Sequence, residues 1–169
     1  MLLRCSFLAE IRVVKIEIMF PSSPLYLPSL LLRLEDGSEF PLFSIPFATT
    51  IAIAKILFGR RIISDVRESF EEVLIDMSDV RDVLRKKVKK VVIDRLDANN
   101  RFYATVIVDE NGTEKRLIMV PSSAILLALM ADADIFIDSL LLGIVRRKER
   151  EEEEETEEEE KKGPREFYI

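Results

Sequence analysis

The fold is decided by residues 88–130, which read VKKVVIDRLDANNRFYATVIVDENGTEKRLIMVPSSAILLALM. Residues 88–96 are expected to form a strand, and the Asp/Asn-rich residues 97–100 a turn. Residues 102–108 and 115–120 predict a hairpin, because Asn111-Gly112 stands between these two apolar runs. A helix is expected from Pro121, with Ser122 as its cap.

A second hairpin is predicted in the N-terminal part of the chain. Residues 11–19 are expected to form a strand, with Val14, Ile16 and Ile18 on one side of it. Residues 29–34 and 39–44 flank Asp36-Gly37, and Asp-Gly between apolar runs is a strong hairpin signal. These segments place three strands before the first helix.

Three helices are expected between the two hairpins. Pro46 and Gly59 fit the start and the end of the first helix, which is apolar nearly all round. Such a helix is either buried or covered by a partner subunit. Residues 64–87 predict two short helices, capped by Ser64 and Ser78, with a break near residues 75–77.

A short strand at residues 135–137 and a last helix from Asp138 and Ser139 complete the pattern. The elements follow the order β-β-β-α-α-α-β-β-β-α-β-α, which is not a regular alternation of strands and helices. This order predicts an α+β fold with a mixed, mostly antiparallel sheet, built from hairpins and packed with several short helices. We expect this domain to span residues 1–145.

Charge divides the chain into a body and a tail. The formal net charge is −6, from 25 Lys/Arg and 31 Asp/Glu. Residues 146–169 hold 7 Lys/Arg and 11 Asp/Glu, so most of the excess negative charge lies in this low-complexity segment. We expect it to be a charged tail that is disordered or extends the last helix. The acidic balance therefore does not exclude DNA or RNA as a partner of the nearly neutral body.

Several absences suggest the setting of the protein. The sequence shows no convincing secretory signal and no membrane span, so a cytoplasmic location without a membrane partner is expected. Cys5 is the only cysteine, which rules out an internal disulfide. Glutamine is absent and asparagine occurs three times. Few thermolabile amides among many charges are typical of thermophile proteins.

The absence of histidine limits the chemistry of the protein. Histidine is the usual general base near neutral pH and a frequent zinc ligand. The GxGxxG, Walker A, GxSxG and HExxH motifs are also missing. Any catalysis would use carboxylates, lysine, tyrosine, serine or threonine, or Cys5.

Carboxylates at strand ends and turns are the first candidates for a site. Asp94 and Asp97 lie at the end of the strand at residues 88–96, and three more aspartates lie in ADADIFID at residues 131–138. Carboxylates that converge can hold Mg²⁺ or Mn²⁺. Their structural alternative is a role in turns and helix caps, where aspartate accepts hydrogen bonds from backbone amides.

A basic run and a pair of serines are further candidates. The basic run would contact nucleic-acid phosphates, or would be a solvated face near a helix end. It consists of Arg85, Lys86, Lys87, Lys89 and Lys90. Ser122 and Ser123 are candidate nucleophiles, with helix capping as the structural alternative for Ser122.

Three segments, in the same order, resemble the bifunctional nuclease (DNase/RNase) domain family, of which this chain would be a divergent member. Residues 102–106, FYATV, follow the apolar strand VIDRL at residues 92–96. Residues 120–129, VPSSAILLAL, resemble the family's Arg-Pro-Ser-Asp-Ala helix entry. Residues 40–45, FPLFSI, lead into an Ala/Ile-rich helix as the family's Leu-Pro-Ile strand does. The resemblance spans about residues 11–142.

The resemblance implies hydrolysis of phosphodiester bonds in DNA or RNA, assisted by Mg²⁺ or Mn²⁺. It makes Asp94 and Asp97 the best carboxylate candidates, with Tyr103 nearby in the hairpin. The sequence also departs from the family pattern. The family's Arg before Pro-Ser is Val120 here, its Asp after Pro-Ser is Ser123, and its His is absent.

These departures leave two other interpretations open. One is a non-catalytic, homo-oligomeric interaction module that keeps the fold and lacks the active site. The other is simple nucleic-acid binding through the basic run, with an affinity that falls steeply as salt increases.

Overall fold

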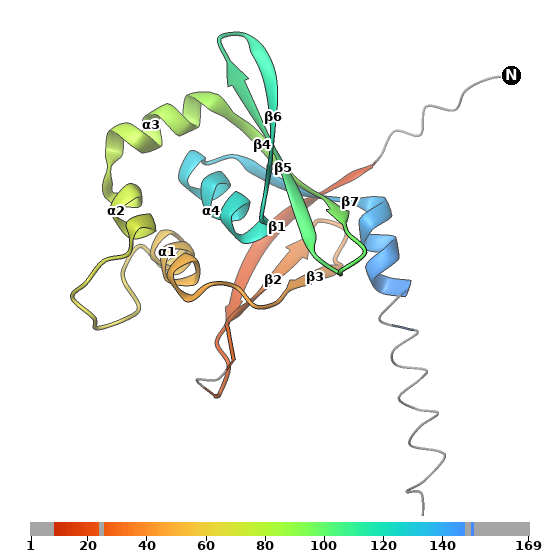
Figure 1. Cartoon of the computed structure of the whole chain (residues 1–169), viewed down its shortest axis with the longest axis horizontal. Coiled ribbons are helices and arrows are strands. Elements are labelled where there is room, and N and C mark those ends of the chain that lie inside the picture. Colours follow the sequence, from red (N-terminus) through yellow and green to blue (C-terminus); the bar gives the residue numbers. More distant parts are fainter. Residues whose placement is uncertain (1–8, 24–25, 148–149, 151–169) are drawn as a thin grey trace, which may run out of the picture.

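The computed structural model describes residues 9–23, 26–147 and 150, so most of the expected tail lies outside the described residues (Figure 1). The elements are β1 (Glu10–Met19), β2 (Ser29–Leu34), β3 (Glu39–Leu42), α1 (Phe47–Phe58), α2 (Phe70–Asp76), α3 (Ser78–Lys87), β4 (Val88–Leu96), β5 (Phe102–Glu110), β6 (Thr113–Met119), α4 (Pro121–Ala131) and β7 (Asp134–Asp138). Residues 139–147 form a further helix. This is the predicted order of elements.

The seven strands form one mixed sheet in the order β3-β2-β1-β7-β4-β5-β6. Of its six neighbouring pairs, five are antiparallel and the pair of β4 and β7 is parallel. Both predicted hairpins occur, and Gly37, Asn111 and Gly112 have the positive φ angles that their turns require. The predicted α+β class is confirmed.

A β-bulge in β1 changes the predicted alternation of that strand. The pairing with β2 shifts between Val13 and Lys15, which makes Val14 the extra residue. Val13, Ile16 and Ile18 pack against the core, whereas Val14 is exposed. The prediction that Val14 shares a side with Ile16 and Ile18 was wrong, because the bulge reverses the alternation at this point.

The break between α2 and α3 was predicted correctly, but the two predicted caps, Ser64 and Ser78, were wrong. Residues 64–69 are not helical, and α2 is capped by Ser69 instead of Ser64. Ser69 forms a capping box with Glu72, in which each side chain bonds the backbone N–H of the other residue. Ser78 is the first residue of α3 and follows Met77, so it is not a cap. The pattern Ser-x-x-Glu was the stronger signal and was overlooked.

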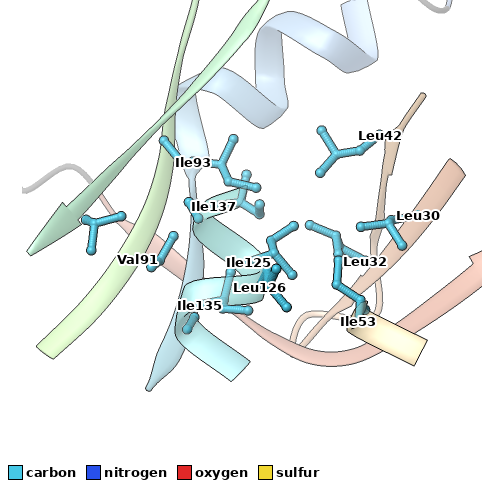
Figure 2. Packing of buried hydrophobic residues seen from close by; sticks show 14 of the residues in the cluster. Leu30, Leu32, Leu42, Ile53, Val91, Ile93, Ile125, Leu126, Ile135 and Ile137 are labelled. Carbon is cyan, nitrogen blue, oxygen red and sulfur yellow. The ribbon is translucent and has the colours of Figure 1, made fainter. Parts of the chain in front are cut away.

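The hydrophobic core lies between the sheet and helices α1 and α4 (Figure 2). Residues 49–54 of α1 are buried in it, so this apolar helix is covered by its own chain. Figure 2 shows Ile125 and Leu126 of α4 pointing toward leucines of β2 and β3 on one side and isoleucines of β4 and β7 on the other. None of the helices in the described part of the chain is long and apolar enough to cross a membrane.

The sheet is strongly curved. Phe40 in β3 and Phe102 in β5 meet edge to face, with ring centroids 5.2 Å apart and an angle of 65° between the rings. Four strands separate β3 from β5 in the sheet order, so the sheet must curl to bring these rings together. The curl brings the end of β3 close to the start of β5, and a cavity lies there.

Candidate functional site

A cavity of about 630 Å³ lies where the curled sheet meets the start of α4. Its walls are three segments far apart in the sequence: residues 42–46 after β3, residues 100–103 at the start of β5, and residues 120–122 at the start of α4. Small-molecule sites in proteins have volumes of about 300–1,000 Å³, so this cavity is large enough for a ligand. It brings together Tyr103 and Ser122, two of the predicted site residues.

The start of α4 supplies hydrogen-bond donors to this cavity. Its N-cap residue is Val120, which has no side-chain acceptor, and Pro121 occupies the first helical position. The backbone N–H groups of Ser122 and Ser123 have no acceptor among the described residues. Free N–H groups and the helix dipole make such a helix start favourable for an anion.

Ser122 does not cap the helix, because it lies inside the first turn and α4 has no side-chain cap bond. Its side chain is only 3% exposed and lines the cavity. Within the described part of the chain, its hydroxyl makes no hydrogen bond. Among the described residues the one buried side-chain polar atom without a partner is Arg81 Nε, so the Ser122 hydroxyl is accessible from the cavity, where a ligand can bond it. Ser123 is half-buried and is not part of the cavity wall.

Residues 100–103 form a second wall, and Asp97, which lies outside the lining, bonds two of them. Asp97 accepts hydrogen bonds from the backbone N–H of Asn99 at 2.8 Å and of Arg101 at 2.9 Å. It also accepts from Arg101 Nε at 2.9 Å and from the Tyr103 hydroxyl at 3.0 Å. The backbone N–H of Arg101, with help from these other donors, lowers the pKa of Asp97 to about 2. Asp97 is therefore a turn carboxylate that orients Arg101 and Tyr103 beside the cavity.

The third wall carries an exposed aromatic ring and an unusual backbone. Phe43 lines the cavity, yet its side chain is 71% exposed. The next residue, Ser44, has a φ of 57°, in the left-handed region that residues other than glycine rarely adopt. Ile45 is buried, and its backbone N–H donates to the carbonyl oxygen of Pro28 at 2.9 Å. The link after β3 is therefore anchored on both sides of Phe43 and Ser44, since Leu42 is also buried.

Asp94 lies in a different place from Asp97. It accepts a hydrogen bond from Thr105 Oγ1 at 2.6 Å and is 3.4 Å from Arg95 Nε. With Thr105 it lines a second cavity of about 350 Å³, which also contains Glu10 and Lys90. Asp94 and Asp97 therefore do not converge on one point, although they are three residues apart.

The basic run does not form a single patch. Arg85 pairs with Asp132 at 2.6 Å, and Lys90 pairs with Glu10 at 2.5 Å. Lys89 lies 3.4 Å from Asp109. Lys86 and Lys87 end α3 and are exposed. Acidic side chains thus offset most of the charge that was expected to face phosphates.

The aspartates of residues 131–138 have structural roles. Asp132 ends α4 with a left-handed backbone, and Asp134 accepts from Arg12 Nη2 at 2.5 Å. Asp138 caps the helix of residues 139–147 by accepting from the backbone N–H of Leu140 at 2.8 Å. Turn and capping roles were the structural alternative, whereas the ion pair of Asp134 with Arg12 was not predicted.

The described residues contain no preformed cluster of ligands for a divalent cation. They contain no group of three or more carboxylate or cysteine side chains that could hold one. Near the cavity, Asp97 already accepts four hydrogen bonds from the turn and its neighbours. Mg²⁺ in nucleotide-handling sites is usually held by one or two carboxylates together with substrate phosphates, so the expected Mg²⁺ or Mn²⁺ would depend on the substrate for many of its ligands.

Arg101 and Phe43 were not among the predicted site residues. Arg101 follows the predicted Asp/Asn-rich turn, and Phe43 follows an alternating apolar run. A cation beside a turn was the one signal that could have indicated Arg101. Nothing local indicated Phe43, because only the curl of the sheet brings it to the cavity.

Comparison with known proteins places the chain in a family. No protein with a curated description matches the chain. The family model of the bifunctional nuclease domain matches residues 50–148, more than half of the chain. The match contains two of the cavity's walls, residues 100–103 and 120–122. The order of elements, the hairpins and this match agree: the chain belongs to the bifunctional nuclease domain family.

Proposed function

We propose that the protein is a nuclease that holds the phosphodiester backbone of DNA or RNA at the start of α4. Its family, described as a nuclease domain, supports this class of activity. The observation that carries the proposed site is the uncapped start of α4, which opens into the cavity beside the hydroxyl of Ser122. This arrangement offers donors to an anion and contains no acidic wall residue.

The proposed reaction is attack of water on phosphorus with cleavage of the bond to the leaving sugar oxygen, which takes up a proton as the water loses one. Its transition state spreads negative charge over the phosphate oxygens. Fixed donors aimed at such charge are the main source of catalysis in sites of this kind. The donors here are the N–H groups of Ser122 and Ser123, the Ser122 hydroxyl and the Arg101 guanidinium. No step is assigned to a metal ion, because the described residues contain no preformed cluster of metal ligands.

The test compares two adjacent serines. Purified protein is incubated with end-labelled single-stranded DNA, duplex DNA and RNA, each with Mg²⁺, with Mn²⁺ and with EDTA. Ser122→Ala removes the hydroxyl from the cavity wall, whereas Ser123→Ala changes a residue outside it. Loss of one donor to the transition state lowers kcat/KM by about 10²-fold. We expect that loss for Ser122→Ala and for Arg101→Ala, and less than a twofold change for Ser123→Ala.

The proposal fails if wild-type protein cleaves no substrate faster than the Ser122→Ala, Arg101→Ala double variant. It also fails if Ser123→Ala is as damaging as Ser122→Ala, because the effect would then not belong to the cavity. Thermal unfolding of each variant separates loss of activity from loss of the fold.

A homo-oligomer is a second candidate, supported by an exposed apolar stripe on α2. Phe70 and Val73 lie one helical turn apart on α2, Met77 follows the helix directly, and all three are exposed. Exposed apolar patches often mark protein–protein contacts. Light scattering at micromolar concentration tests this: the wild type should be larger than a monomer, and Phe70→Ser with Val73→Ser should reduce its mass. A monomeric wild type would remove this candidate.

A further inference from the structure

We infer that the substrate enters the cavity as an unpaired strand, with one base stacked on the ring of Phe43 while its phosphate lies at the start of α4. This inference rests on the proposed nuclease function and names the class of its substrate. It assigns a specificity role to Phe43, which is a residue outside the stretch matched by the family model.

Phe43 presents an aromatic face beside the phosphate donors. It lines the same cavity as Ser122 and Arg101, and 71% of its side chain is exposed. Proteins that bind single strands combine backbone-binding groups with aromatic rings on which bases stack. The cavity has both parts in its lining, and most of its lining surface is apolar.

The position of the ring is fixed by its neighbours and not by its own burial. Leu42 and Ile45 are buried on either side, and the link between them contains the left-handed Ser44. A left-handed backbone at a residue other than glycine is costly and persists only where the surroundings enforce it. The link therefore holds an apolar ring at the surface, where it contributes little to the core.

The shape of the site favours an unpaired base over a duplex. In a duplex both faces of every base are covered by stacked neighbours, so a base must be unstacked before it can lie on a protein ring. The cavity is formed by three chain segments and holds about 630 Å³, which suits a small group such as one nucleotide and not a double helix. An unpaired strand offers such a group without the cost of opening base pairs.

The experiment measures binding and cleavage in parallel. Fluorescence anisotropy in EDTA gives the Kd of a labelled oligothymidine and of the same strand annealed to its complement. The variants are Phe43→Leu and, as control, Phe58→Leu, which changes a ring that is 57% exposed at the other end of α1 and outside this cavity. Loss of one stacked base corresponds to about a tenfold or greater rise in Kd.

We expect tighter binding of the single strand than of the duplex, a rise of about tenfold in Kd for Phe43→Leu, and no change for Phe58→Leu. Equal affinity for single strand and duplex overturns the inference, as does an equal effect of the two variants. A Phe43→Leu variant that changes the oligomeric mass but not the Kd also overturns it, because the ring would then belong to an interface between copies. Single-strand binding that depends on Phe43 without any cleavage supports the inference and overturns the proposed nuclease activity instead.

Discussion

The hydroxyl of Tyr103 donates a hydrogen bond of 3.0 Å to Asp97 Oδ2, which ties the start of β5 to the turn that precedes it. Asp97 also accepts from two backbone N–H groups and from Arg101 Nε. The carboxylate is therefore part of the scaffold of the cavity. It positions Arg101 and Tyr103 and has little capacity left for a ligand of its own.

The first prediction concerns the pH dependence of stability. The pKa of Asp97 is about 2 in the folded protein, below its ordinary value of 3.8. A lowered pKa means that the carboxylate stabilises the fold fully above about pH 4 and loses this effect as pH falls toward 2. We expect Asp97→Asn to lower the free energy of unfolding at pH 7 and to differ progressively less from wild type between pH 4 and pH 2.5.

Urea unfolding at several pH values measures this difference. Glu17, whose pKa is also lowered to about 2 by Arg33, is present in both proteins and cancels in the comparison. Tyr103→Phe is the control, because it keeps the carboxylate and the backbone donors of the turn. If the free energies of unfolding of wild type and Asp97→Asn differ by the same amount from pH 7 to pH 2.5, the lowered pKa of Asp97 is contradicted.

The second prediction concerns a buried ion pair in the segment between α1 and α2. Glu72 is 2% exposed, and Arg61 Nε lies 2.6 Å from its Oε1. Arg61 also donates to the carbonyl oxygen of Arg67 at 2.7 Å. Arg61→Ala should lower the free energy of unfolding by about 3 kcal/mol, because it leaves a buried carboxylate unpaired.

Chemical denaturation of Arg61→Ala and of a control, Arg67→Ala, checks this. Arg67 pairs with Asp65 on the surface, where such pairs contribute about 0–1 kcal/mol. If the two variants lose similar amounts of free energy of unfolding, the burial of Glu72 is not the cause of the destabilisation by Arg61→Ala.

The third prediction compares Ser69, the observed cap of α2, with Ser64, the cap that the sequence predicted. Ser69→Ala should destabilise the protein by about 1 kcal/mol, because it removes the acceptor of the capping box. Ser64→Ala should stay within about 0.5 kcal/mol of wild type, since residue 64 lies in a non-helical segment. Thermal unfolding of the two variants measures the contrast, and the reverse order would contradict the observed start of α2.

The fourth prediction concerns the curl of the sheet. Phe40 is fully buried and meets the ring of Phe102. Phe40→Ala should lower the free energy of unfolding by about 3–5 kcal/mol, because it leaves a large void in the core. It should also weaken oligothymidine binding, since the walls of the cavity would separate. Near-ultraviolet circular dichroism and anisotropy would show both effects, and unchanged binding in a destabilised variant would argue against this coupling.

The fifth prediction uses salt to separate the cavity from the basic run. Each phosphate neutralised on a single strand contributes about −0.7 to the slope of log affinity against log salt. One guanidinium in the cavity predicts a slope of about −0.7, whereas all five residues of the basic run predict about −3.5. Anisotropy titrations over a range of NaCl concentrations measure the slope. A value near −3.5 would assign binding to the basic run, and Lys86→Ala with Lys87→Ala should then reduce it.

Local signals explain why so much of the fold was predicted. Asp36-Gly37 and Asn111-Gly112 fix two hairpins through backbone geometry that depends on adjacent residues. Pro46 and Gly59 likewise mark the ends of α1. Such signals do not state which strands become neighbours. The parallel pairing of β4 with β7 and the place of β1 beside β7 depend on packing over the whole chain.

The candidate site was predicted only in part, for the same reason. Tyr103 and Ser122 share the cavity, but Asp94 faces a different one and Asp97 serves its own turn. Residue type and position on a strand indicated which side chains are polar. They could not indicate which of them the curl of the sheet would bring together.

The way the cavity is assembled has a consequence for folding kinetics. Its walls come from distant parts of the chain, so closing them requires contacts of high sequence separation, which form slowly and at a large cost in chain entropy. Ligand binding at the cavity would then report the last step of folding, after the hairpins have formed. A fragment cut to residues 50–148 would lack the wall that carries Phe43 together with strands β1 to β3, and should be unable to complete that step.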